Sequence, residues 1–207
     1  MSALHMFDMD GTLLRDTTAA LEISRHLDCE PTLQELERQF ADSEIEAWEF
    51  AVAVRSLWGE LDPSLVASVV ADAPWISGID EVCADIAARG ETSMLVTLSP
   101  TFFARHLLDR GLDVVHGSVW SDPIDPAAIL TPGDKVRLAD AERAARGLPL
   151  SACVAYGDSG SDVPLFAHLT HTVAINASPG LEAAVDYRGN DLREAYALGR
   201  ALLDRPS

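Results

Sequence analysis

Short apolar segments alternate with amphipathic segments along most of the chain, and this alternation restricts the fold more than any other feature. The apolar segments cover residues 4–7, 94–98, 114–119, 153–156 and 173–175. Short runs that are apolar throughout are typical of strands buried on both faces. Segments with helical periodicity lie between or after them, at residues 78–89, 102–110, 134–146 and 191–204. Strands that alternate with helices predict an α/β fold with a doubly wound parallel sheet.

One long stretch departs from this alternation. Between residues 16 and 74 the sequence shows only helical periodicity, interrupted at Glu30-Pro31, Gly59 and Asp62-Pro63. This stretch follows directly after the first strand and its loop, so we expect a helical cap over the carboxyl end of the sheet. The predicted organisation is an α/β core of residues 1–15 and 75–207 with an all-helical cap of residues 16–74.

Charge and cysteine content restrict the partners and the compartment. The formal net charge of −18 argues against nucleic acid or an anionic membrane as partner, because both would be repelled. No apolar run approaches the roughly 20 residues of a membrane-spanning helix, and the first residues do not resemble a signal peptide. Three widely spaced cysteines without a CxxC pair argue against a disulfide framework or structural zinc, and predict a cytoplasmic protein.

Acidic side chains follow two of the predicted strands. Asp8 and Asp10 follow the first strand, and Asp158 and Asp162 follow the fourth, at the edge where open α/β sheets bind ligands. Two carboxylates as close as Asp8 and Asp10 cannot both ionise cheaply unless a cation lies between them or one stays protonated. A metal-bound Asp8 could attack phosphorus, and a partly protonated Asp10 could donate a proton to the leaving oxygen. For such a pair taken alone, an acidic turn that caps the following helix is the alternative.

The segment FDMDGTL at residues 7–13 resembles the first motif of the haloacid dehalogenase superfamily of phosphohydrolases. That family also has a Ser or Thr at the end of the second strand, a Lys before the fourth strand and an acidic Gly-Asp-x-x-x-Asp after it. Ser99, Lys135 and the pair Asp158 and Asp162 follow in that order, so the resemblance spans nearly the whole chain. It implies a Mg²⁺-dependent phosphatase that acts on a small phosphorylated metabolite through an aspartyl phosphate on Asp8.

The resemblance also implies a role for each of these residues. Asp8 would be the nucleophile and Asp10 the general acid and base. Mg²⁺ would bind Asp8, Asp10 and Asp158, with a main-chain carbonyl among the ligands, while Asp162 would brace Lys135 or a metal-bound water. The residues implied to bind phosphate or substrate are Gly11, Ser99, Lys135, Arg55 and Ser161.

The register of the second predicted strand leaves one role open. Thr97 replaces Ser99 as the phosphate-binding hydroxyl if the register is shifted by two residues. Ser99 could also serve only to cap the helix that begins near Thr101.

The helical insertion between the first two motifs is similar to the cap of phosphoserine phosphatases and their relatives. In those enzymes a Glu binds the substrate's amino group and a cap Arg binds its carboxylate. Thr17 stands where that Glu is expected, whereas Arg55 matches the Arg, and loss of the ammonium partner disfavours phosphoserine itself. We expect Trp48, Phe50 and Trp58 mainly in the core of the cap, with one or two of them open to the substrate.

Two other classes of function remain. A phosphotransferase or mutase of the same superfamily would use the same motifs. A non-catalytic binding protein on this fold is disfavoured, because every chemical position is filled. The sequence leaves both a monomer and a homodimer open.

Overall fold

The first strand of the chain lies at the centre of a parallel sheet. The structure is a computed structural model and describes residues 2–42 and 44–204. Within these residues the strand order is β3-β2-β1-β4-β5-β6, with every neighbouring pair parallel. The strands are β1 (Leu4–Phe7), β2 (Thr92–Pro100), β3 (Val114–Ser118), β4 (Cys153–Gly157), β5 (Thr172–Ile175) and β6 (Val185–Tyr187).

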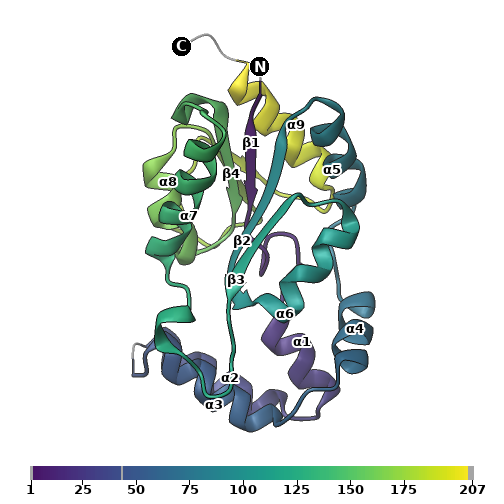
Figure 1. Cartoon of the computed structure of the whole chain (residues 1–207), viewed down its shortest axis with the longest axis vertical. Helices are drawn as coiled ribbons and strands as arrows, with labels where there is room; N and C mark the ends of the chain where they lie inside the picture. Colours follow the sequence, from purple (N-terminus) through teal and green to yellow (C-terminus); the bar gives the residue numbers. More distant parts are fainter. Residues whose placement is uncertain (1, 43, 205–207) are drawn as a thin grey trace.

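Helices cover both faces of this sheet. Figure 1 shows α5 and α9 on one side of the strands and α7 and α8 on the other, which confirms the prediction of a doubly wound α/β fold. None of the described helices is both long and apolar enough to cross a membrane. The helices are α1 (Ala19–His26), α2 (Glu30–Ala41), α3 (Ala47–Trp58), α4 (Pro63–Asp72), α5 (Ile79–Ala88), α6 (Thr101–Ala104), α7 (Pro132–Ala145), α8 (Val163–His168) and α9 (Leu192–Leu203).

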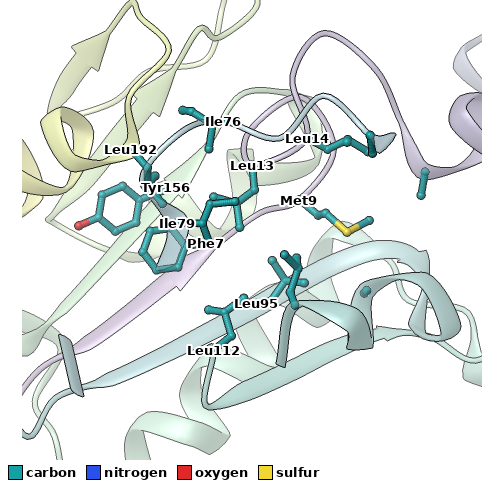
Figure 2. Packing of buried hydrophobic residues seen from close by; sticks show 14 of the residues in the cluster. Phe7, Met9, Leu13, Leu14, Ile76, Ile79, Leu95, Leu112, Tyr156 and Leu192 are labelled. Atoms are coloured by element: carbon teal, nitrogen blue, oxygen red, sulfur yellow. The ribbon is translucent and has the colours of Figure 1, made fainter. Parts of the chain in front are cut away.

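The apolar strands pack against both layers because successive side chains point to opposite faces of a sheet. In β1, Met6 packs in the hydrophobic cluster shared with α7 and α8, whereas Phe7 packs in the cluster shared with α5 and α9. Phe7 stacks on Tyr156 of β4, with ring centroids 4.5 Å apart, and Ile79 and Leu192 lie beside them (Figure 2). A strand buried in this way is apolar at most positions, which is the pattern in the sequence, and His5 is the one polar residue of β1.

Four helices, α1 to α4, follow β1 and its loop. Figure 1 places them together beyond the carboxyl ends of the strands. The interruptions noted in the sequence are helix boundaries: α2 begins at Glu30-Pro31, Gly59 ends α3 with a φ of 66°, and α4 begins at Pro63 after the N-cap Asp62. Proline at the first turn lacks only an N–H that has no partner there, and glycine adopts positive φ without strain.

Two elements differ from those expected. Strand β6 was not predicted, because Val185–Tyr187 is too short to show any periodicity and lies at the edge of the sheet. The expected helix at residues 102–110 is α6 followed by a 3₁₀ helix, Arg105–Arg110, that ends at Gly111 with a φ of 95°. Apolar spacing does not distinguish these two helix types over so few turns.

A cluster of buried polar side chains connects β1 to α9. His5 is fully buried, with Nε2 3.0 Å from Glu91 Oε2 and Nδ1 3.2 Å from the hydroxyl of Tyr156. Arg200 donates to both Glu91 oxygens, at 2.6 and 2.7 Å. Burial lowers the pKa of His5 despite the neighbouring carboxylate. A neutral imidazole fits both contacts, with Nε2–H donating to Glu91 and Nδ1 accepting from Tyr156.

Replacing Glu91 with alanine should therefore destabilise the fold. The change leaves the buried His5 N–H without its acceptor and removes the closer carboxylate partner of Arg200, so we expect a loss of about 2–3 kcal/mol in the free energy of unfolding. Urea unfolding measures it. Glu35→Ala is the control, because Glu35 pairs only on the surface with Arg38 and its loss should cost much less than that of Glu91. Equal losses in the two variants would contradict a structural role for the cluster.

Candidate active site

The loop after β1 packs closely against the loop after β4. Asp8 begins this loop, and its N–H donates to the carbonyl of Tyr156 at 2.9 Å. Gly11 has a φ of 79°, and a Cβ at this position would lie 2.2 Å from Asp158 Oδ2. Thr12 joins the loops as well, since its hydroxyl lies 3.5 Å from Asp8 Oδ2 and 3.2 Å from Asp158 Oδ1. A glycine at position 11 is therefore what allows Asp8 and Asp158 to lie side by side.

Lys135 lies at the start of α7 and is fully buried. Its Nζ donates to Asp8 Oδ1 at 2.6 Å, to Asp162 Oδ1 at 2.7 Å and to Ser161 Oγ at 3.1 Å. Burial alone would lower the pKa of Lys135, but the charges of Asp8 and Asp162 outweigh it and raise that pKa. The ammonium group is therefore held charged and in a fixed position between the two acidic loops.

Asp162 is buried and holds the loop after β4 in place through hydrogen bonds to its main chain. It is 1% exposed, and its Oδ2 accepts the N–H groups of Asp158 at 3.0 Å and Ser159 at 3.2 Å. A Cβ on Gly157 would lie 2.4 Å from the Asp162 carboxyl carbon, so only glycine leaves room for this side chain. Its other oxygen accepts from Lys135, so both oxygens of Asp162 are occupied by protein donors.

Three carboxylates lie close enough together to hold a cation. Asp8, Asp158 and Asp162 each offer an oxygen within 4.8 Å of the others. Burial, followed by neighbouring carboxylate charges, raises the pKa of Asp158 to about 7 and that of Asp8 well above its usual range, although Lys135 opposes the shift at Asp8. One lysine does not balance this negative charge. Because clustered carboxylate oxygens are what Mg²⁺ prefers, the residues fit a bound Mg²⁺.

Replacing Asp158 with asparagine tests this charge imbalance. A carboxyl whose pKa is raised on folding destabilises the native state once it ionises, so the metal-free variant should be more stable at pH 8 by about 1 kcal/mol. The difference should shrink toward pH 4, where Asp158 is protonated in the folded protein. Mg²⁺ at 100 times its Kd should stabilise wild type by about 2.7 kcal/mol and the variant much less. Thermal unfolding with and without Mg²⁺ measures both effects, and a variant stabilised by Mg²⁺ as strongly as wild type would contradict the ligand role.

Asp10 is hydrogen-bonded to the first helix of the helical segment and to the end of β2. Its Oδ1 accepts the N–H of Ala19, the first residue of α1, at 2.8 Å, and its Oδ2 accepts the hydroxyl of Ser99 and, at 3.5 Å, that of Thr97. Burial raises the pKa of Asp10, while the hydrogen bond from Ser99 acts against the shift. A carboxyl with a raised pKa can hold a proton nearer neutral pH than an ordinary aspartate.

Ser99 and Thr97 are both placed at the end of β2. Thr97 is 1% exposed, and its hydroxyl also accepts the N–H of Ser99 at 3.1 Å. Ser99 is only half-buried and does not cap α6, whose N-cap residue is Pro100. Of the two hydroxyls, that of Ser99 is the more accessible to a ligand.

A cavity of about 340 Å³ lies between these residues and the helical segment. Asp8, Asp10, Ser99, Ser159 and Ser161 line it from the sheet side. Side chains of α2, α3 and the segment after β3 complete its walls. Most of the acidic and hydroxyl groups of the lining are therefore gathered on the sheet side, and the opposite side is apolar except for Thr18 and Glu37.

The structure does not bring every predicted residue to this cavity. Arg55 lies outside its lining, because its guanidinium donates to the carbonyl of Trp120 at 3.3 Å and pairs with Asp122 at 3.4 Å. The N–H of Gly11 donates to the carbonyls of Leu14 and Thr17 and is therefore not directed at a ligand. In the structure Arg55 joins α3 to the segment after β3 and Gly11 forms a turn, so neither is directed into the cavity, and their roles in binding substrate or phosphate stay predictions.

Thr18 and Glu37 are the polar lining residues on the side of the helical segment, and the sequence analysis did not identify them. Thr17, the neighbour of Thr18, is not part of the lining: it is buried, and its hydroxyl donates to Glu22. Glu37 follows the buried Leu33 by four residues on α2 and therefore lies on the inward face of that helix. An acidic residue four positions after an apolar residue of an amphipathic helix was the sequence signal that could have identified Glu37.

Comparisons with known proteins agree with this geometry. The family model of haloacid dehalogenase-like hydrolases matches residues 6–167. No curated protein sequence matches the chain significantly.

Several solved structures share the fold at low sequence identity. A haloacid dehalogenase family hydrolase from Salmonella enterica subsp. enterica serovar Typhi has a TM-score of 0.81 and 18% identity, over 92% of this chain and 68% of its own. A substrate-bound phosphoserine phosphatase has a TM-score of 0.78 and 20% identity, over 95% of this chain and 98% of its own. A probable phosphoserine phosphatase from Vibrio cholerae has a TM-score of 0.81 and 18% identity, over 98% of this chain and 65% of its own.

Proposed function

The chain belongs to the haloacid dehalogenase-like hydrolase family, and on that basis we propose that it is a Mg²⁺-dependent phosphatase acting on a small phosphorylated metabolite. One observation carries the proposal. The carboxylate that ends the central strand, Asp8, is held by the buried Lys135 beside further carboxylates and opens onto a cavity. This combination offers a nucleophile, a phosphate-binding cation and metal ligands within one site.

In the first step, an oxygen of Asp8 attacks phosphorus in line with the leaving oxygen, and the bond from phosphorus to that oxygen breaks. Asp10 gives its proton to the departing alkoxide. In this mechanism Lys135, Ser99 and Ser161 would bind the phosphoryl oxygens. Asp8, Asp158 and the main-chain carbonyl of Asp10 would hold Mg²⁺, which when bound would supply positive charge beside the phosphoryl oxygens.

In the second step, Asp10 takes a proton from water, which attacks phosphorus and releases Asp8 and inorganic phosphate. Asp10 also accepts the N–H of Ala19, so the acid–base group is attached to the first helix of the segment that covers the site. We assign residues 16–74 to this cap and residues 1–15 and 75–207 to the catalytic core. Opening of the cap would admit water for the second step, and we place the enzyme in the cytoplasm.

The proposal is tested by phosphate release from a panel of small phosphomonoesters, phosphoserine included, with Mg²⁺ or with EDTA. We expect turnover of at least one ester that EDTA abolishes and added Mg²⁺ restores. An alcohol acceptor in the same assay distinguishes hydrolysis from phosphotransfer, since a transferase would form the new ester in place of phosphate. Turnover that persists unchanged in EDTA would overturn the Mg²⁺-dependent mechanism.

A further inference from the structure

The walls of the cavity restrict the group that the phosphate is attached to. They include the aromatic and aliphatic side chains of Phe40, Phe50, Trp120, Ile129 and Leu130. A volume of about 340 Å³ is at the low end of the range for small-molecule sites, about 300–1,000 Å³. Apolar walls favour a leaving group whose body is itself apolar, because both surfaces leave water on binding.

Glu37 is the one ionisable side chain that lines this cavity besides Asp8 and Asp10, among the residues that the structure describes. Its Oε1 accepts the hydroxyl of Thr18 at 3.2 Å. That hydroxyl is itself oriented, because it caps α1 by accepting the N–H of Leu21 at 3.1 Å. Glu37 is therefore held in place by a donor from a neighbouring helix.

The charge of Glu37 is poorly compensated. Burial raises the pKa of Glu37, the hydrogen bond from Thr18 opposes this, and the negative charge of Asp10 adds to it. The nearby cation, Arg25, forms ion pairs with Glu22 and Glu30 instead. A cationic group entering the cavity would gain from this carboxylate.

A carboxylate on the substrate would find no such partner. Within the described part of the chain, the lining of the cavity contains no arginine, lysine or histidine. Arg55, the cation expected from the sequence, is held by Trp120 and Asp122 outside that lining. A carboxylate would also be repelled by Glu37, so the cavity disfavours phosphorylated amino acids.

From these observations we propose that Glu37 binds a protonated amine, and that the substrate is the phosphate monoester of an apolar amino alcohol without a carboxylate. This inference rests on the proposed phosphatase function and adds a substrate class to it. The amine would pair with Glu37 while its carbon skeleton lies against Phe50 and Trp120. The phosphate would lie at Asp8.

Three aryl phosphates that differ only in the terminal group of one side chain test the proposal. They are tyramine O-phosphate, 4-propylphenyl phosphate and 3-(4-phosphooxyphenyl)propanoate, which end in an amine, a methyl and a carboxylate. For wild type we expect kcat/KM to be about 10–100 times higher for the amine than for the propyl ester, the range of a charge-assisted hydrogen bond. The carboxylate ester should be the poorest of the three.

Variants of α2 assign the preference to Glu37. In Glu37→Gln the ratio between amine and propyl esters should fall to about 1, and in Glu37→Lys the carboxylate ester should become the better substrate. Glu35→Gln, on the exposed face of the same helix, should keep the wild-type ratio. A Glu37→Gln protein that keeps the preference, or wild type that prefers the propyl or carboxylate ester, would overturn this inference alone. If wild type hydrolyses none of the three esters, nor any ester of the wider panel, the phosphatase proposal fails with it.

Discussion

Asp8→Asn should lower the rate of phosphate release by about 10³-fold or more, because an amide cannot supply the carboxylate oxygen that attacks phosphorus. The fold should be kept. Asparagine has the size of aspartate, and its Oδ1 can still accept the hydrogen bond from Lys135. Burial already raises the pKa of the Asp8 carboxyl, so replacing it with a neutral amide removes an unfavourable buried charge. Initial rates at saturating Mg²⁺ and thermal unfolding measure the two effects separately.

Asp16→Asn is the matched control for this variant. Asp16 lies in the same loop, its side chain is 85% exposed, and it has a φ of 54°, which asparagine also adopts readily. Its rate should stay within about twofold of wild type, as for an exposed substitution away from the site. Wild type quenched during turnover should carry phosphate that hydroxylamine releases, as an acyl phosphate does, and Asp8→Asn should carry none. Labelled phosphate on the variant, or an undiminished rate, would contradict a nucleophilic Asp8.

The parts of the site that could be predicted are those fixed by strand ends. Asp8 and Asp158 each follow a buried strand, Ser99 lies at the end of another, and strands aligned as parallel neighbours end at the same edge of the sheet. Their proximity is thus a consequence of topology, which the alternation of strands and helices already specifies. Lys135 was placed by its position in the family pattern, because a lysine at the start of a helix is by itself more often exposed.

The parts that could not be predicted depend on which way a long side chain turns. Glu37 lies on α2 and Arg55 on α3, and spacing along a helix identifies a face but not the partner that a flexible side chain reaches. Arg55 is turned to Asp122 and the carbonyl of Trp120, which are more than 60 residues away in sequence. Glu37 is turned to Thr18 by a contact between α1 and α2. Such contacts arise only once the helices have packed together.

Lys135 is the only lysine in the chain, and its replacement by methionine should have the second large effect. Asp8 and Asp162 would remain buried without their shared cation, and removing one partner of a buried ion pair costs about 3–5 kcal/mol of unfolding free energy. Methionine keeps an unbranched apolar side chain of similar length, so lost packing contributes little. Arg137→Met, on the exposed surface of the same helix, should cost about 0.5 kcal/mol or less.

The loss of unfolding free energy in Lys135→Met should be smaller when the negative charge of its partner Asp162 is removed as well. If Lys135 acts by balancing the carboxylates, the double variant Lys135→Met/Asp162→Asn should lose less stability than the sum of the two single variants, by about 1 kcal/mol or more. Mg²⁺ should also recover part of the loss in the single variant, because it supplies positive charge beside Asp8. Urea unfolding of the four proteins, with and without Mg²⁺, measures both couplings. Strictly additive losses that Mg²⁺ leaves unchanged would show that Lys135 acts through packing and not through charge.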